Sequence, residues 1–223
     1  MTSAMVDQTL LNDVVLFRDL SPEALTAITD AADTRPLQRG DIVFTQDDDP
    51  DELFVVERGR IAIANKSDDG RESLIALMER GDLFGEMPLF DGLPRSAEAR
   101  ALEESQVVAI PYGPLRDAFE EEPGHLWTVV ELLAGRLRAT DEALADSVFL
   151  DVTGRTAKRL LELAGDSDEF TLPITQEELA GMVGASRERV NKAIASFIRL
   201  GWVEQNDRLY TVTNRRQMSI RAR

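Results

Sequence analysis

The chain has 223 residues, of which 43% are hydrophobic, and a formal net charge of -16. This length is enough for one large domain or two modest ones with filled cores. The complete lack of cysteine excludes disulfides, thiol catalysis, iron–sulfur clusters and thiolate zinc sites. The single histidine, His125, cannot build a His-rich metal site, and we expect its side chain on the surface.

Membrane and secretion signals are missing from the sequence. No uninterrupted apolar run approaches the length needed to cross a bilayer. The N-terminus lacks the basic-then-apolar pattern of a secretion signal. We therefore expect a soluble, cytoplasmic protein with no membrane partner.

The charge is distributed unevenly between the two ends of the chain. Residues 151–223 hold 12 Lys and Arg against 10 Asp and Glu, which leaves 13 against 31 for residues 1–150. An acidic region joined to a mildly basic one fits a sensor domain joined to a DNA-binding domain. A small positive balance is also ordinary for any small domain, so charge alone decides little.

The N-terminal region is expected to be helical to about Ala32 and to change to strands from Arg39. Ser21 followed by Pro22 is typical of an N-cap and first helical position. Short alternating apolar runs then indicate half-buried strands: Ile42, Phe44, Leu53, Val55, Ile61, Ile63, Leu74, Ala76, Val107 and Ala109. Glycine-containing turns at 39–41, 57–60, 67–70 and 80–82 separate the runs. This pattern predicts a compact antiparallel barrel or roll.

Residues 123–150 are expected to form one long helix. Its apolar residues follow a spacing of four and three, as in the seam of a two-stranded coiled coil: Leu126, Val130, Leu133, Leu137, Leu144 and Val148. Thr140 fills the gap in this series, and its hydroxyl needs a hydrogen-bond partner in the backbone or in something bound beside it. We favour a dimer helix, and the alternative is an amphipathic helix that packs on its own domain.

A motif suited to a phosphorylated ligand runs from Gly81 to Ala97. Gly85 allows close approach of the backbone, and the turn beginning at Gly85 and Glu86 can point free N–H groups at an anion. The Glu86 carboxylate can accept a hydrogen bond from a ribose hydroxyl. Arg95 offers a planar cation to a phosphate and Ser96 adds a hydroxyl donor. The alternative is a surface turn that contains a Glu–Arg pair.

The C-terminal region has the spacing of a helix-turn-helix. Residues 156–164 are predicted to be a short amphipathic helix. Thr175 opens a capping box before a helix over 176–183, and Gly184-Ala-Ser186 is a tight turn before a helix from Arg187 to about Arg199. Residues 201–205 and 208–212 are predicted to form a hairpin that acts as a wing. The alternative, a helix and hairpin with no role in DNA binding, leaves the basic start of the second helix unexplained.

The start of that second helix carries side chains suited to reading DNA. Recognition helices contact base edges from their N-terminal residues, and we expect Ser186 and the charged residues after it to contact DNA. Arg187 and Lys192 can read guanine, and Glu188 can accept from the cytosine amino group. Arg189 is expected to meet a phosphate.

Two stretches of the N-terminal region, 84–90 (FGEMPLF) and 94–97 (PRSA), resemble the phosphate-binding cassette of cyclic-nucleotide-binding domains. Residues 136–140 (RLRAT) and 149–155 (FLDVTGR) resemble the dimer helix and hinge of bacterial cyclic AMP receptor proteins, in the Crp–Fnr superfamily of transcription regulators. The string GASRERVNK at 184–192 is similar to the recognition segment of that family, which reads a TGTGA-type half-site.

This resemblance implies roles for individual residues of the nucleotide site. Arg95 and Ser96 are expected on the cyclic phosphate, and Gly85 and Glu86 beside the phosphate and ribose. In the helix we expect Arg136 to line the site and Thr140 to contact the purine. Asp141 stands where relatives more often carry serine or asparagine, and its carboxylate can accept from the adenine amine but cannot donate.

We therefore predict an α+β chain of three parts: a β-roll with flanking helices over 1–122, a dimerisation helix over 123–150, and a winged helix-turn-helix domain over 151–223. The expected protein is a homodimeric regulator, not an enzyme, gated by cyclic AMP as allosteric effector. It binds a palindromic TGTGA-like site in double-stranded DNA, with RNA polymerase as a further partner and no metal.

Three alternatives stay open at this point. The same regulator could respond to a different effector or to none, although haem or iron–sulfur sensing is disfavoured without cysteine. A nucleotide-processing enzyme is disfavoured because the sequence has no P-loop, no metal-ligand cluster and no nucleophile–base pair that includes histidine. A purely protein-binding cyclic-nucleotide module would leave the residues from Arg187 to Lys192 without a purpose.

Overall fold

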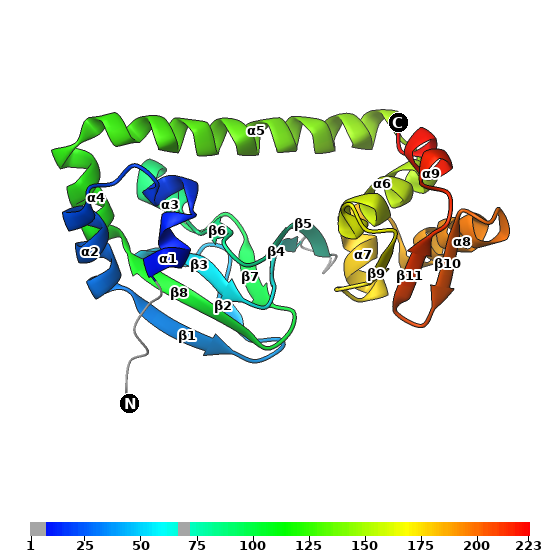
Figure 1. Ribbon diagram of the computed structural model, residues 1–223, viewed down its shortest axis with the longest axis horizontal. Coiled ribbons are helices and arrows are strands. Elements are labelled where there is room, and N and C mark those ends of the chain that lie inside the picture. Colours follow the sequence, from blue (N-terminus) through cyan, green and yellow to red (C-terminus); the bar gives the residue numbers. More distant parts are fainter. Residues whose placement is uncertain (1–7, 67–71) are drawn as a thin grey trace. The chain divides into compact units, whose positions relative to one another are not determined.

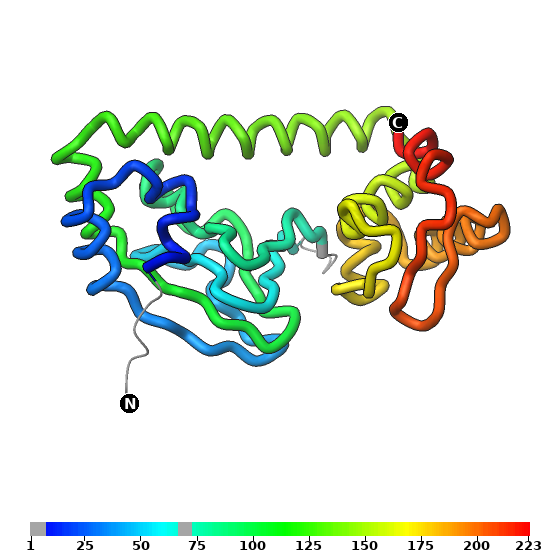
Figure 2. Tube along the Cα trace, viewed as in Figure 1, coloured from blue at the N-terminus to red at the C-terminus, as the bar shows by residue number. Residues whose placement is uncertain are grey.

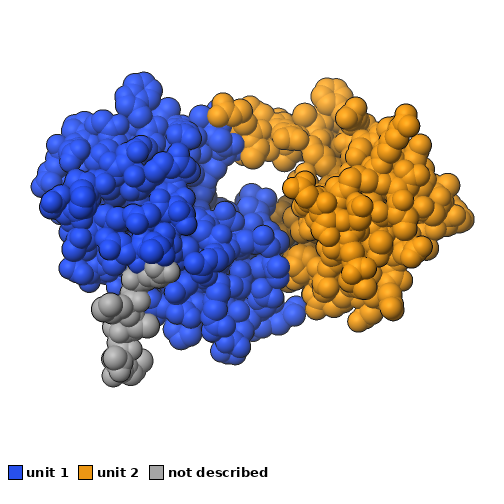
Figure 3. Space-filling view, viewed as in Figure 1, with its two compact units in different colours: residues 1–65, 75–137 blue, residues 66–74, 138–223 orange. Residues whose placement is uncertain are grey.

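The structure is a computed structural model that describes residues 8–66 and 72–223. The chain divides into two compact units, one formed by residues 1–65 and 75–137 and the other by 66–74 and 138–223 (Figure 3). Each unit is described by itself. The turn expected at 67–70 and the first seven residues of the expected N-terminal helical region lie outside the described residues.

The first unit contains two four-stranded sheets and several short helices (Figure 1). Its helices are α1 Gln8–Asn12, the 3-10 helix η1 Val15–Phe17, α2 Pro22–Ala31, α3 Met87–Asp91 and α4 Tyr112–Glu121. One sheet has the order β1-β8-β3-β6 and the other β2-β7-β4-β5. The strands are β1 Asp33–Leu37, β2 Ile42–Phe44, β3 Glu52–Arg58, β4 Ile61–Lys66, β5 Glu72–Met78, β6 Leu83–Phe84, β7 Glu98–Ala101 and β8 Ser105–Pro111.

The central strand β3 is buried on both faces, which differs from the expected half-buried alternation. Leu53 and Val55 belong to a core shared with α1, α2 and α4, whereas Phe54 and Val56 belong to a second core against β4 and β7. The first sheet is therefore a middle layer between the helices and the second sheet. Because both faces of β3 are covered, neither face carries the polar side chains that a half-buried strand shows at every second position.

Strands β1 and β7 were not anticipated. The edge strand β1 pairs only with β8 in its sheet and includes Pro36, which an edge strand tolerates because one side of its backbone needs no partner. Strand β7 lies between β2 and β4, directly after the motif that contains Arg95. The cap expected at Ser21 is confirmed, since its Oγ accepts from the Ala24 N–H at 3.2 Å.

The long helix starts slightly later than expected. Residues Pro123–His125 form the 3-10 turn η2, and α5 runs without a break from Leu126 to Phe149 (Figure 2). The expectation of a surface His125 is wrong, because only 12% of its side chain is exposed. Among the described residues, no helix has the length and apolarity that a membrane span requires.

The second unit has the expected winged helix-turn-helix elements. They are α6 Val152–Ala164, α7 Gln176–Val183, α8 Arg187–Arg199, β10 Val203–Asn206 and β11 Leu209–Val212. The capping box of Thr175 and Glu178 and the cap at Ser186 are confirmed. Helix α6 begins four residues earlier than predicted, because the Asp151 side chain caps it through the Gly154 N–H at 2.8 Å.

Two elements of this unit were missed. Strand β9 Glu169–Thr171 pairs with β11. Helix α9 Arg215–Arg221 follows the wing and buries Met218 completely. The fold is an α+β chain with an N-terminal β-sheet domain, a long helix and a C-terminal winged helix-turn-helix, as expected.

Two glycines with similar backbone angles allow a controlled test of the tight turn between β3 and β4. Gly59 and Gly40 both have positive φ, +80° and +91°, but an added Cβ meets the Ser105 Oγ at 2.3 Å only at Gly59. We expect Gly40→Ala to cost about 1 kcal/mol of unfolding free energy from backbone strain. Gly59→Ala should cost about 1–3 kcal/mol more through overpacking, measured by urea denaturation. Equal losses would contradict this account of the turn.

Candidate functional site

The predicted phosphate-binding motif begins where strand β6 ends at Phe84. Gly85 has a φ of +77°, and a Cβ at this position would lie 2.7 Å from the Arg95 Nη1. Both the left-handed backbone and the close guanidinium therefore require glycine. Glu86 follows at the N-cap position of the short helix α3, and Pro88 is near its start.

Arg95 turns inward and lies against the same turn. Its Nη1 donates to the Gly85 carbonyl and its Nη2 to the Glu52 carbonyl, each at 2.7 Å. The guanidinium carbon is 4.2 Å from the centre of the Phe44 ring, in the geometry of a cation–π contact. The residue is only 4% exposed, and its Nε has no hydrogen-bond partner among the described residues.

Tyr112 completes the support of Gly85 and was not anticipated from the sequence. Its hydroxyl donates to the Gly85 carbonyl at 2.6 Å and accepts from the Arg95 Nη1 at 3.1 Å. Burial raises the pKa of Tyr112 to about 12, so the hydroxyl stays protonated at neutral pH and can keep donating. No sequence spacing links Tyr112 to Arg95, because the two meet only through the pairing of distant strands.

Glu86 is fully buried and pairs with Arg136 of the long helix α5. The Arg136 Nη1 donates to the Glu86 Oε1, and its Nη2 donates to the Leu83 carbonyl at 2.6 Å. Burial raises the pKa of the Glu86 carboxyl above its usual value, although the charge of Arg136 opposes this shift. The Glu86 Oε2 has no hydrogen-bond partner within the described part of the chain.

These contacts leave one buried donor and one buried acceptor unsatisfied. Buried polar groups are normally paired, and an unpaired one costs free energy. The Arg95 Nε can donate to an anionic oxygen, and the Glu86 Oε2 can accept from a hydroxyl. A small ligand that carries both a phosphate and a sugar hydroxyl would satisfy the two atoms.

The structure brings Gly85, Glu86, Arg95 and Arg136 together. Ser96 is exposed, and its hydroxyl contacts the Met87 sulfur at 3.8 Å. Thr140 and Asp141 are exposed residues of α5 that belong to the second unit. Their roles toward a ligand stay predictions.

The recognition helix α8 presents its charged start to solvent. Ser186 caps it through the Arg189 N–H at 3.4 Å, while Val190 and Phe197 are buried on the opposite side. The Lys192 Nζ contacts the Glu188 Oε1 at 2.7 Å, and 75% of each side chain is exposed. The hydrogen bond from Lys192 lowers the pKa of the Glu188 carboxyl. Both members of this pair are therefore accessible for new contacts.

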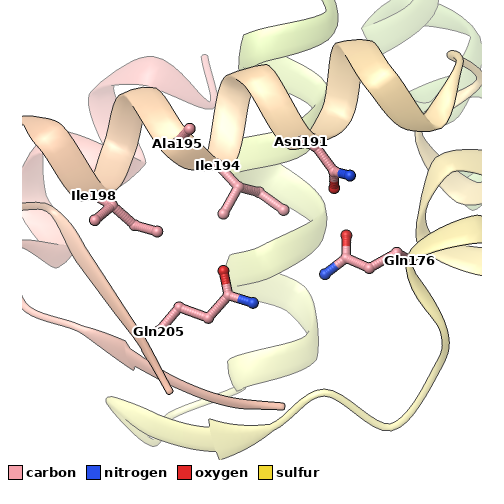
Figure 4. Close-up of a pocket in the computed structure, with 6 residues that line it drawn as sticks. All are labelled: Gln176, Asn191, Ile194, Ala195, Ile198 and Gln205. Atoms are coloured by element: carbon pink, nitrogen blue, oxygen red, sulfur yellow. The ribbon is translucent and has the colours of Figure 1, made fainter. Parts of the chain in front are cut away.

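An open groove of about 280 Å³ continues along the same helix. Figure 4 shows side chains from α7, α8 and β10 directed into it: Gln176, Asn191, Ile194, Ala195, Ile198 and Gln205. Asn191 lies one helical turn after Arg187, so both are on one face of α8.

Neither unit shows a metal site among its described residues, since no group of three or more His, Cys, Asp or Glu side chains converges there. A guanidinium, a carboxylate, hydroxyls and backbone groups form the first site. Charged and amide side chains on a helix form the second.

Comparisons with known proteins match both units. Residues 34–122 match the family model of the cyclic nucleotide-binding domain, and residues 154–219 match that of the Crp-like helix-turn-helix domain. A "CRP-like cAMP-activated global transcriptional regulator" of Mycobacterium tuberculosis is 36% identical over 93% of this chain and 96% of its own length.

Solved structures show the same architecture. The catabolite activator protein of Thermus thermophilus is 29% identical, with a TM-score of 0.53 over 93% of this chain and 98% of its own. The global regulator CLP of Xanthomonas campestris, described as responsive to c-di-GMP, is 24% identical, with a TM-score of 0.74 over 86% of this chain and 99% of its own.

The buried Glu86 carboxyl predicts a pH-dependent effect of Glu86→Gln. Because the folded-state pKa is raised, the stability that this group contributes is present below its unfolded pKa, which is about 4.3, and is lost as the pH rises through the folded pKa. The difference in unfolding free energy, Glu86→Gln minus parent protein, should therefore become more positive between pH 4.5 and pH 7.5. Urea denaturation at each pH measures it. If Glu86→Gln instead loses stability relative to the parent protein as the pH rises, the ion pair with Arg136 stabilises the charged carboxylate by more than burial destabilises it.

Proposed function

The chain belongs to the Crp–Fnr superfamily of DNA-binding transcription regulators, and we propose that cyclic AMP bound in its first unit gates the binding of a homodimer to palindromic DNA. The observation that carries the proposal is the pair of unsatisfied buried atoms, the Arg95 Nε and the Glu86 Oε2. A cyclic nucleotide supplies a phosphate oxygen to the first and a ribose 2′-hydroxyl to the second.

The remaining residues of the site fit this ligand. Gly85 lets the backbone approach the phosphate closely, and the exposed Ser96 hydroxyl can donate to it. Arg136 orients the Glu86 carboxyl for the ribose. Thr140 and Asp141 would contact the purine, where a carboxylate accepts from the amine of adenine but cannot donate to the carbonyl of guanine.

Cyclic AMP is preferred because the Mycobacterium tuberculosis relative, with 36% identity, is described as cAMP-activated. The alternative is the same regulator with another effector, since CLP of Xanthomonas campestris is described as responsive to c-di-GMP. A regulator with no effector would leave the buried donor and acceptor without a purpose. Binding rather than turnover is expected, and chromatography of cyclic nucleotides incubated with the protein tests this.

The dimer is supported by the two faces of helix α5. Val129 is buried against the core of its own unit and Leu132 packs beside it, so one face is already covered. The predicted seam is not covered: the exposed fractions are 43% at Leu126, 51% at Val130, 38% at Leu133, 62% at Leu137, 63% at Leu144 and 67% at Val148. A row of exposed apolar residues with coiled-coil spacing fits a second copy of the same helix.

Two recognition helices in such a dimer would meet successive major grooves about 34 Å apart, which requires a palindrome. Arg187 and Lys192 would read guanine and Glu188 cytosine in a TGTGA-like half-site, with Arg189 on a phosphate. Such a regulator works in the cytoplasm beside RNA polymerase, its expected partner at promoters.

Calorimetric titration tests the nucleotide site. We expect micromolar affinity for cyclic AMP and none in Arg95→Ala, because the cyclic phosphate loses its cation. Ser96→Ala should weaken binding by only about 1 kcal/mol, the net value of one hydrogen bond. Arg80→Ala is the control, an exposed arginine that donates to the Glu57 carbonyl. Absence of heat with the parent protein at several temperatures contradicts a cyclic AMP site.

Sedimentation equilibrium tests the dimer seam with two leucines of nearly equal exposure. Leu137→Ala removes a side chain that is 62% exposed in the single chain. Because each subunit of the dimer carries the substitution, the lost apolar contact is counted twice in the dimer. We expect the dimer Kd to rise by about 100-fold, which corresponds to nearly 3 kcal/mol. Leu93→Ala, at a site that is 61% exposed and outside the apolar series of α5, should leave the Kd unchanged. Equal effects would rule out the α5 seam.

Measurements of DNA binding can distinguish a residue that reads bases from one that contacts a phosphate on the same helix. Arg187→Ala should weaken binding to a duplex with two TGTGA half-sites by roughly 1–3 kcal/mol and have less effect on a scrambled duplex. Arg189→Ala should weaken both duplexes equally, because a phosphate contact carries no base information. Fluorescence anisotropy at fixed salt measures both. Equal losses for Arg187→Ala on the two duplexes would refute its role in base reading.

A further inference from the structure

The junction between helices α5 and α6 is held by Lys158. Its Nζ lies 2.6 Å from the Glu142 Oε1 and 2.6 Å from the Asp146 Oδ2. These two acids are four residues apart on α5, so they present their carboxylates on one face of that helix. Only 19% of the Lys158 side chain and 15% of the Asp146 side chain are exposed, which shields this contact from solvent, whereas Glu142 is 67% exposed.

A second contact fixes the turn itself. The Asp151 side chain caps α6 and also accepts from the Nη2 of Arg221, the last residue of helix α9. At the other end of α9, Arg215 donates to the Gly165 carbonyl at 2.9 Å and to the Ser167 carbonyl at 2.6 Å. Helix α9 is thus attached to both ends of α6, because Asp151 precedes its first turn and Gly165 follows its last.

Helix α6 is also connected to the helix-turn-helix. The Arg155 Nη1 donates to the Leu150 carbonyl at 2.7 Å, and its Nε donates to the Val183 carbonyl at 2.8 Å. Val183 ends α7 and immediately precedes the turn to α8. A change in the direction of α6 relative to α5 would therefore move the recognition helix with it.

We propose that Lys158 is a positioning residue that transmits the state of α5 to the DNA-binding domain. Its partner Glu142 directly follows Asp141, one of the residues expected to touch the purine, so a ligand beside Asp141 acts next to the Lys158 contact. The inference rests on the proposed function, and it adds the residue through which the two sites communicate. Nothing in it requires Lys158 to touch nucleotide or DNA.

The neighbouring residue Arg159 provides a matched control. It also forms an ion pair on α6, but its partner Glu162 is on the same helix, at 2.5 Å. Loss of the Arg159 pair removes a charge and a contact within α6 but leaves both ion pairs of Lys158 with α5 in place. Lys158→Gln and Arg159→Gln each remove one positive charge from α6, and only the first breaks ion pairs that join α5 to α6.

The experiment measures the Kd for a duplex with two TGTGA half-sites, with and without saturating cyclic AMP, in the full-length protein. The ratio of the two values is the coupling between the sites. We expect Lys158→Gln to reduce this ratio by about fivefold or more, the smallest coupling commonly observed. Lys158→Arg should restore most of it, and Arg159→Gln should leave it unchanged. A lower melting temperature in Lys158→Gln with an unchanged ratio would overturn the proposal.

Hydrogen exchange keeps the inference separate from the proposed function. If cyclic AMP leaves the Kd of the parent protein unchanged, gating by cyclic AMP fails but the junction is still testable. Amides 150–156 should then exchange at least about tenfold faster in Lys158→Gln than in Arg159→Gln, because opening of the junction exposes them. Equal exchange in the two variants would exclude Lys158 as the residue that holds α6 to α5.

Discussion

The buried ion pair between Glu86 and Arg136 joins the β-domain of the first unit to the long helix α5. A fully buried carboxylate is costly, and removal of Arg136 would leave it without its charged partner. The pair therefore ties the position of the predicted phosphate-binding turn to the position of the helix. Arg136 precedes Thr140 by one helical turn. A ligand hydroxyl on the free oxygen of Glu86 would thus change the contacts of the helix that also carries the proposed dimer seam.

Helix α5 has a different function on each of its faces. Val129 and Leu132 pack into the core of the first unit, and Arg136 reaches the candidate ligand site. The exposed apolar residues of the proposed seam, such as Leu137, are available to a partner helix. Farther along, Glu142 and Asp146 hold Lys158 of α6. In the proposed function, nucleotide, partner subunit and DNA-binding domain would all contact this one helix, so a change at any of them could reach the others.

Local hydrogen bonds were predictable from the sequence, whereas contacts between distant strands were not. The capping box at Thr175 and the cap at Ser186 follow from residues three positions apart, and the structure has both. Gly85 and Arg95 were expected in one motif and do meet. The support from Tyr112 and the Phe44 ring was missed, because it depends on the register of strands far apart in the chain. Strand β9 and helix α9 were missed because their neighbours in space, rather than their own periodicity, stabilise them.

The most direct test of the account is reciprocal linkage between the two sites. The affinity for cyclic AMP is measured by calorimetry in the free protein and in the protein saturated with a duplex that carries two TGTGA half-sites. If the nucleotide gates DNA binding, DNA must tighten cyclic AMP binding by the same factor by which cyclic AMP tightens DNA binding, commonly about 5- to 150-fold. Identical cyclic AMP affinities in the two samples would show that the sites are uncoupled and would contradict a ligand-gated regulator.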